Sequence, residues 1–286
     1  MALSAVPSRS RTLTAAAACA LALVAAGQVP QAQASSSGPA SAQVTEKSYN
    51  WGGYILRQAG LTKITAHFIV PTADCSAQGD GNYTNAAFWI GLDGGLPTGQ
   101  NTTIEQAGVD VNCLEELPQY HAWWEVEGPS ENAGSHQITE TVRPGDFIKI
   151  AVEHETGAQF RFNVVDYGQV NSTDGPPLWS DETTASVPGG VTPQLNSAEA
   201  VAERPVDGRW LYPLTRFGDF DFLRVKVNGA ALRTYPEANL VKKQLVQNTG
   251  LDPSGANLLA DTGPLAEGAG DAFHIIWRHY GTTRTP

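Results

Sequence analysis

Acidic and aromatic residues stand close together at two places in the sequence, and their spacing suits acid–base chemistry. Glu125 and Glu127 follow Trp123 at intervals of two residues, and Glu199 and Glu203 are four residues apart. In an extended strand, side chains separated by an even number of residues point to the same face. Carboxyl groups on one face beside aromatic rings favour a cleft that binds a polymer. The alternative is that the tryptophans fill the core and the acids are solvated.

The signatures of several other hydrolases are absent from the sequence. It contains no G-x-S-x-G, no H-E-x-x-H and no phosphate-binding P-loop. Asp261-Thr262-Gly263 matches the triplet of aspartic peptidases, but that chemistry needs two carboxyl groups that share a proton, and no second triplet is present. We interpret this triplet as a turn. We expect no metal site and no cofactor.

The chain is acidic, with a net charge of −11. Loss of Arg9 and Arg11 with a cleaved N-terminal signal leaves 16 basic against 29 acidic residues, so the mature charge is −13. Such a chain is a poor partner for nucleic acid or an anionic membrane. Its low content of Lys and Arg also limits self-repulsion when the carboxylates are protonated, which is compatible with an acidic habitat.

The N-terminal segment has the three parts of a secretory signal. Arg9 and Arg11 provide a positive start, Leu13–Ala26 is an apolar run, and residues 32–34 (Ala-Gln-Ala) offer a small-x-small cleavage site. The apolar run is too short to span a membrane comfortably, and no later stretch is long and apolar enough. We therefore predict a signal peptide at residues 1–34 and a secreted, extracellular product.

The part that follows the signal divides into a short leader and one domain. Residues 35–48 are rich in Ser, Ala, Gly and Pro, which predicts a disordered leader. Residues 49–286 form the predicted single domain. It retains Cys75 and Cys113, and in an oxidising compartment these two favour a disulfide over free thiols or a metal site.

Short runs rich in Val, Ile, Phe, Tyr and Trp, each bounded by turn residues, indicate β-strands throughout the domain. Their regular spacing predicts an all-β fold, a β-sandwich. Glu237–Gln247 is the best candidate for a helix. The predicted strands are Lys63–Val70, Ala86–Leu92, Thr103–Val111, Tyr120–Val126, Phe147–Glu153, Phe160–Val165 and Phe220–Val227.

Six segments, in this order, resemble the glutamic peptidases, a secreted family also called eqolisins and known best from fungi. The resemblance covers most of residues 50–230, and we expect a bacterial member. The matching segments are Asn50–Gly53 (NWGG), Phe68–Pro71 (FIVP), Trp89–Gly94 (WIGLDG), Gln106–Asp110 (QAGVD), Tyr120–Glu125 (YHAWWE) and Ala198–Pro205 (AEAVAERP).

The resemblance implies a concanavalin-like or jelly-roll-like sandwich of two antiparallel sheets and a catalytic pair, Gln106 and Glu203. Glu203 then serves as general base and acid that activates water, and the Gln106 amide stabilises the oxyanion. The implied activity is that of a pepstatin-insensitive acid endopeptidase, a monomer that acts on polypeptides. Residues implied to bind substrate are Trp51, Trp89, Asp93, Asp110 and Glu125.

The sequence departs from the family at several points, and two other functions remain open. His121 stands where the family usually has Asp, and only a short leader precedes Asn50. One alternative is a jelly-roll glycoside hydrolase, with two glutamates as acid and nucleophile and tryptophans that stack on sugar. The other is a non-catalytic carbohydrate-binding module, in which Glu203 is a plain edge residue.

Overall fold

The computed structural model describes residues 43–76, 83–97, 100, 103–128, 134–169, 175–207, 210–247 and 257–283. The chain divides into the units Met1–Pro39 and Ala40–Pro286, and the fold below is that of the second unit. The predicted signal peptide, residues 1–34, lies outside the described residues. Within the described part of the chain, no helix is long and apolar enough to cross a membrane.

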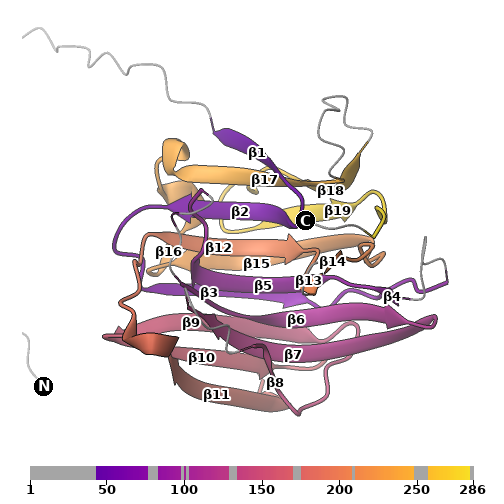
Figure 1. The fold of residues 1–286 in the computed structure, drawn as a ribbon, viewed down its shortest axis with the longest axis horizontal. Helices are drawn as coiled ribbons and strands as arrows, with labels where there is room; N and C mark the ends of the chain where they lie inside the picture. The colour runs from indigo at the N-terminus through magenta and orange to yellow at the C-terminus, as the bar shows by residue number, and fades with distance from the viewer. Residues whose placement is uncertain are drawn as a thin grey trace, which may run out of the picture. The chain divides into compact units, whose positions relative to one another are not determined.

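The fold is all-β, as predicted, and its strands form two sheets with a small separate hairpin (Figure 1). All strand pairs are antiparallel except that of β1 with β17. Three short 3-10 turns, at Pro188–Gly190, Leu232–Thr234 and Glu237–Asn239, are the only helical segments in the described ranges.

Sheet A has its main strands in the order β1 (Val44–Ser48), β17 (Leu240–Val246), β2 (Trp51–Arg57), β12 (Ser197–Glu203), β5 (Ala87–Asp93), β6 (Ile104–Leu114), β7 (Leu117–Glu127) and β8 (His136–Gln137). Beside these run β4 (Tyr83–Thr84), β18 (Leu258–Thr262) and β19 (Phe273–Trp277).

Sheet B has the order β11 (Trp179–Ser186), β10 (Gln159–Asp166), β9 (Phe147–Thr156), β3 (Lys63–Ile69), β15 (Asp219–Val227) and β16 (Ala230–Ala231). The separate hairpin consists of β13 (Val206–Asp207) and β14 (Trp210–Leu211). Each of the seven runs predicted as strands lies largely within one of these strands.

Strand β15 passes from one sheet to the other. Its residues 219–222 pair with β19 in sheet A, whereas Leu223, Lys226 and Val227 pair with β3 in sheet B. The pairing is interrupted at Arg224, which has a φ of 52°. A bulge of this kind bends a strand, and here it joins the edges of the two sheets.

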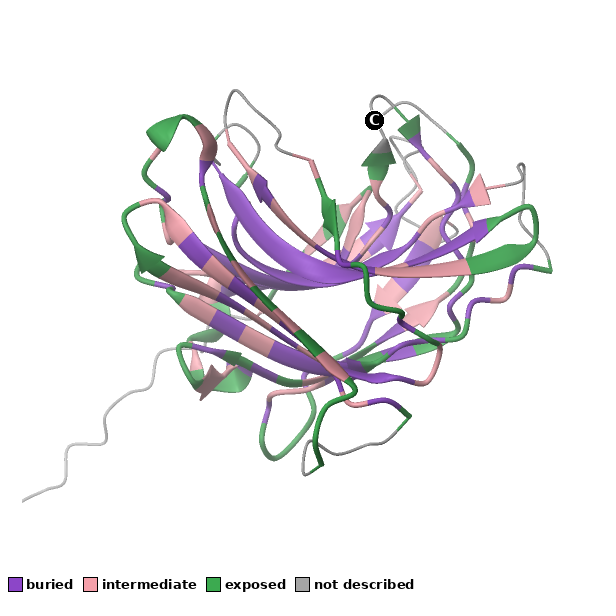
Figure 2. Ribbon diagram, turned by 90° about the horizontal axis from the view of Figure 1, so that it is seen from below, coloured by how far each residue is buried: buried purple, intermediate pink, exposed green. Residues whose placement is uncertain are grey.

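The core lies between the two sheets and is built from their facing side chains. In sheet A, Phe88 stacks on Phe220 with 4.0 Å between ring centroids, and Phe220 in turn contacts Phe68 of sheet B. Strands β9 and β10 alternate buried with half-buried residues, as expected for strands with one solvated face. All seven residues of β5 are buried, so this strand is covered on both faces (Figure 2).

The second cover of β5 is a small apolar cluster on the face of sheet A away from the core. Trp89, Trp123 and Ile104 are its largest buried members, and Trp51 packs against it. Gly108 makes this packing possible, because a Cβ atom there would stand 2.5 Å from the Trp89 Cβ and 3.0 Å from the Trp123 ring. Trp51, Trp89 and Trp123 therefore do not belong to the main core. They form a second apolar layer beneath the site.

Three expectations about local structure were wrong. Residues 44–48 of the predicted leader form β1, which pairs along its whole length with β17, while residues 35–42 lie outside the described part. The predicted helix at Glu237–Gln247 is mostly β17, because this segment pairs with β1 and β2 and, at Leu245 and Val246, with β18. Asp261 and Thr262 end β18 and are not part of a turn.

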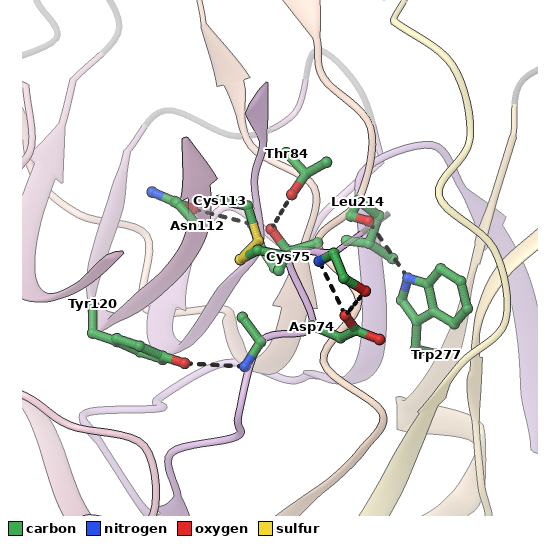
Figure 3. The surroundings of a disulfide bond; sticks show 12 residues. Asp74, Cys75, Thr84, Asn112, Cys113, Tyr120, Leu214 and Trp277 are labelled. Carbon is green, nitrogen blue, oxygen red and sulfur yellow. Dashed lines mark hydrogen bonds between the residues drawn. A yellow bond between two sulfur atoms is a disulfide. The ribbon is translucent and has the colours of Figure 1, made fainter. Parts of the chain in front are cut away.

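The structure joins Cys75 to Cys113 in a disulfide with a Cα–Cα distance of 5.6 Å (Figure 3). The bond links the loop after β3 to the far end of β6. Nearby, the Ala73 N–H donates to the Tyr120 hydroxyl at 3.0 Å. The loop after β3 is thus fixed to the β6–β7 hairpin, which also carries the functional side chains.

Candidate active site

A cleft of about 430 Å³ lies on the outer face of sheet A, over the tryptophan cluster. Strands β2, β12, β5, β6 and β7 supply most of its walls. Its ionisable lining residues are all acidic within the described part of the chain: Asp110, Glu125, Glu127 and Glu203. Gln106 and Trp51 also line the cleft. The two predicted catalytic residues, Gln106 and Glu203, therefore lie in the same cleft.

Strand register explains why these side chains share a face. Glu203 pairs with Trp51 on one side and Ala87 on the other, and Ala87 pairs with Asp110. Directly paired residues in adjacent strands point to the same face. The small side chain of Ala87 leaves room above the sheet between the two acids.

A second row, which crosses β5 four residues further along, carries the glutamine. Gln106 pairs with Gly91 on β5 and with Glu125 on β7. Gly91 has no side chain to fill the space beside Gln106, where an added Cβ would stand 3.2 Å from the Gln106 Cβ. The predicted grouping of Glu125 and Glu127 with Trp123 is confirmed, since all three line the cleft.

The carboxyl group of Glu203 receives hydrogen bonds from strand β5 and from the residue just before β2. The Trp89 Nε1–H donates to Oε2 at 2.6 Å, and the Asn50 Nδ2–H donates to Oε1 at 3.4 Å. Burial raises the pKa of Glu203 to about 7, and hydrogen bonds from Trp89, Trp51 and Asn50 oppose that rise. Glu203 is therefore a carboxyl group able to take up or release a proton in weakly acidic to neutral solution.

Gln106 is 6% exposed, and its amide is held in one orientation. Its Nε2 donates to Glu125 Oε2 at 3.0 Å, whereas its Oε1 has no hydrogen-bond partner among the described residues. Burial raises the pKa of Glu125 to about 7, and the nearby Glu127 and Glu203 add to this. Glu125 thus takes up one of the two amide N–H groups of Gln106, while Oε1 is buried from solvent without a partner among the described residues.

Asp110 completes the acidic lining beside Trp123. The Trp123 Nε1–H donates to Asp110 Oδ1 at 2.8 Å. Burial raises the pKa of Asp110 to about 7, and the Trp123 hydrogen bond opposes the rise. Two indole N–H groups, of Trp89 and Trp123, therefore each fix one carboxyl group of the cleft.

The sequence-based site prediction was wrong about Asp93. Asp93 is fully buried and does not line the cleft; its carboxylate accepts the backbone N–H groups of Gln194, Leu195 and Asn196 at 2.9–3.0 Å. It fastens the loop before β12 to the end of β5. Trp89 does not line the cleft either. It contributes to the site by its hydrogen bond to Glu203.

The prediction missed Asn50 as a partner of Glu203. The sequence signal was present, because Asn50 begins the NWGG segment, but the two residues are 153 positions apart and only strand pairing shows their contact. No group of three or more His, Cys, Asp and Glu side chains in the described ranges is arranged to hold a metal ion.

A comparison with protein-family models shows to which family the chain belongs. The family model described as Peptidase A4 family matches residues 49–251. This chain belongs to the Peptidase A4 family. The resemblance to the glutamic peptidases noted in the sequence is in this respect confirmed.

Individual relatives agree with this assignment. Aspergillopepsin-2 of Aspergillus niger is 32% identical over 123 residues, which cover 38% of this chain and 42% of that protein. The match therefore spans less than half the length of that curated relative.

Solved structures support the two-sheet sandwich. A scytalido-glutamic peptidase with a transition-state analogue inhibitor matches with a TM-score of 0.58 and 18% identity, over 80% of this chain and 98% of that one. SCP-B, a member of the eqolisin family in complex with the tripeptide Ala-Ile-His, matches with a TM-score of 0.55, 18% identity and the same coverage. At these identities the likeness establishes the fold, a β-sandwich.

Proposed function

We propose that this protein is a secreted acid endopeptidase that hydrolyses peptide bonds with Glu203 and Gln106. The observation that carries the proposal is that these two side chains line one cleft in a chain of the Peptidase A4 family. The extracellular location rests on the N-terminal signal pattern and is proposed with it.

Glu203 acts first as a general base. Its carboxylate takes a proton from a water molecule, which then attacks the peptide carbonyl carbon. The same group, now protonated, gives its proton to the leaving amine as the C–N bond breaks. The Trp89 N–H on Oε2 holds the carboxyl group in place during both transfers.

Gln106 stabilises the charge that develops on the carbonyl oxygen. Glu125 occupies one of its two amide N–H groups, which fixes the plane of the amide and leaves the second N–H free to donate to the oxyanion. Its Oε1 has no partner in the described ranges and is buried from solvent, so it accepts a hydrogen bond from the attacking water only if that water enters beside it with the substrate. An amide keeps both functions at every pH, because it does not titrate.

The pH range of this chemistry follows from the crowded acids. Glu203, Glu125 and Asp110 each have a pKa raised to about 7 by burial, so all three are largely protonated in strong acid. Ionisation of one raises the pKa of the others, since like charges repel. The singly ionised forms of this cluster, among them the one with Glu203 ionised and its neighbours protonated, are therefore populated in weak acid, and activity is expected to peak there.

An assay on denatured casein from about pH 2 to 8, with and without pepstatin, tests the proposal. Expected is a bell-shaped profile with its maximum below pH 7, unchanged by pepstatin and absent in a Glu203→Gln variant. Proteolysis inhibited by pepstatin, or no proteolysis at any pH, would overturn the proposal. In the latter case, release of reducing sugar from polysaccharides by the same protein would favour the glycoside hydrolase.

A further inference from the structure

The residue directly before β2 touches the proposed catalytic base. Asn50 lies between β1 and β2 and donates its Nδ2–H to Glu203 Oε1 at 3.4 Å. Its backbone carbonyl also accepts the N–H of Arg204 at 2.7 Å. Asn50 is thus joined through both main chain and side chain to the end of β12.

Ser48 determines which end of the Asn50 amide faces Glu203. The Ser48 hydroxyl accepts the Trp51 N–H and donates its own proton to Asn50 Oδ1, both at 3.1 Å. Because the carbonyl end of the amide is occupied by this donor, the NH₂ end is turned toward the carboxyl group. The reverse orientation would place two oxygen acceptors against each other.

Strand β1 keeps Ser48 in position. Residues 44–48 pair in parallel with β17, and Glu46 forms ion pairs with Arg57 at 2.8 Å and with Lys243 at 2.6 Å. The Arg57 hydrogen bond and Lys243 lower the pKa of Glu46 to about 2. The stability contributed by this depressed pKa is complete above the unfolded pKa near 4.5 and is lost progressively as the pH falls toward 2. Glu46 itself stays ionised until the pH approaches 2, so its ion pairs persist in weak acid, in which the enzyme is proposed to act.

We infer that Asn50 is a positioning residue for Glu203, and that β1 holds it in place through Ser48. The inference rests on the proposed function of Glu203. In this arrangement the Asn50 N–H stabilises the ionised form of the carboxyl group, together with the Trp89 indole. The residues just before Asn50 then belong to the working enzyme and not to a dispensable leader.

The acids that face Glu203 remain in place when Asn50 or Ser48 is changed. Glu125 and Glu127 face it from β7 and Asp110 faces it from β6, while Trp51 and Trp89 approach from β2 and β5. Removal of the Asn50 amide therefore takes away one donor and leaves the like-charged surroundings unaltered. Because a donor to the ionised form is lost, the substitution is expected to raise the pKa of Glu203.

The test compares Asn50→Ala, Ser48→Ala and the matched control Thr45→Ala, an exposed residue on the same strand. The pH profile of kcat/KM is recorded, and the Glu203 carboxyl is titrated by NMR in protein labelled with ¹³C-carboxyl glutamate, its signal assigned by its loss in Glu203→Gln. Asn50→Ala is expected to move the low-pH limb of the kcat/KM profile and the Glu203 titration upward by ~0.5–1 pH unit. At pH values below the limb, this shift corresponds to a ~3- to 10-fold loss of kcat/KM. Ser48→Ala is expected to move both in the same direction by less, and Thr45→Ala to move neither.

The two readouts separate failure of the inference from failure of the proposed function. Unchanged titration and unchanged pH profile in a folded Asn50→Ala protein would overturn the inference. A wild-type protein without peptidase activity would overturn the proposed function, while the shift in the Glu203 titration would still establish the positioning contact. If Asn50→Ala fails to fold, Ser48→Ala decides by the same criteria.

Discussion

Asp93 and Glu203 lie at the ends of neighbouring strands of sheet A, and their carboxyl groups accept hydrogen bonds from different kinds of donor. Asp93 ends β5 and accepts three backbone N–H groups at 2.9–3.0 Å in a fully buried site. Glu203 ends β12 and is held mainly by side chains, the Trp89 indole and the Asn50 amide, at the edge of a cleft. Backbone donors fix a charge and a loop, whereas side-chain donors in a half-buried site leave a carboxyl group that can exchange its proton.

Glu105 and Glu199 show a third environment in the same sheet. Both are fully buried, and no backbone N–H in the described ranges donates to either carboxyl group. Burial raises the pKa of Glu105 to about 9 and that of Glu199 well above its usual range. These two groups are neutral in acid, and their ionisation opposes folding.

Replacement of Glu203 by Gln is expected to have the largest effect. The amide keeps the shape and the bond from Trp89 but cannot take a proton from water, so kcat/KM is expected to fall by ~10³-fold or more. The thermal midpoint is expected to change little. A Glu203→Gln protein with near wild-type turnover would contradict the role of Glu203, and Glu237→Gln, at an exposed position, is the control.

Replacement of Asp93 by Asn should instead act on stability. Asn tolerates the φ of 60° found at this position, so the change removes the charge without backbone strain. Loss of a carboxylate that accepts three N–H groups is expected to lower the free energy of unfolding by about 2–3 kcal/mol. Urea unfolding measures this, with the exposed Asp219→Asn as control; a loss of activity without a loss of stability would refute the contrast with Glu203.

The buried acids without backbone donors predict the pH dependence of stability. A carboxyl group whose pKa is raised to about 9 contributes stability below its unfolded pKa near 4.5, and that stability is lost as the pH rises toward 9. The thermal midpoint is therefore expected to fall from pH 5 to pH 8. In Glu105→Gln the fall in unfolding free energy should be smaller by about 2 kcal/mol. Equal slopes in the two proteins would show that Glu105 is not the titrating group.

The smallest expected effect is that of Trp89→Phe. An aromatic ring, though a smaller one, is kept beside Trp51, and the N–H on Glu203 is lost. One charge-assisted hydrogen bond corresponds to a ~10-fold loss in kcat/KM at low pH and to an upward shift of the low-pH limb. Trp179→Phe on β11, remote from the cleft, should leave the profile unchanged; an equal shift in both variants would argue against a specific bond.

The sequence predicted the strands of the sandwich because they depend on local patterns, whereas the residues proposed for the site came from the resemblance to the glutamic peptidases. Alternation marked β7 correctly and placed Glu125 and Glu127 on one face with Trp123. The parts that were wrong or missed depend on pairing over long distances. The pattern of β17 was read as helical because its partners β1 and β2 lie far away in the chain.

Asp93 and Asn50 illustrate the same limit at the site. The motif around Asp93 suggested a substrate contact, but the loop 194–196, a hundred residues later, covers it. Asn50 contacts Glu203 only because β2 pairs with β12. Both residues stand in segments that the sequence marks, but the local sequence does not show which distant residues they contact.

A double-mutant cycle on one peptide substrate tests most directly whether Gln106 and Glu203 act as a unit. Gln106→Ala alone is expected to lower kcat/KM by ~10²- to 10³-fold and Glu203→Gln by more, with the double variant no slower than Glu203→Gln within a few-fold. Losses that multiply in the double variant, or a single variant with near wild-type activity, would contradict the proposed Gln–Glu pair.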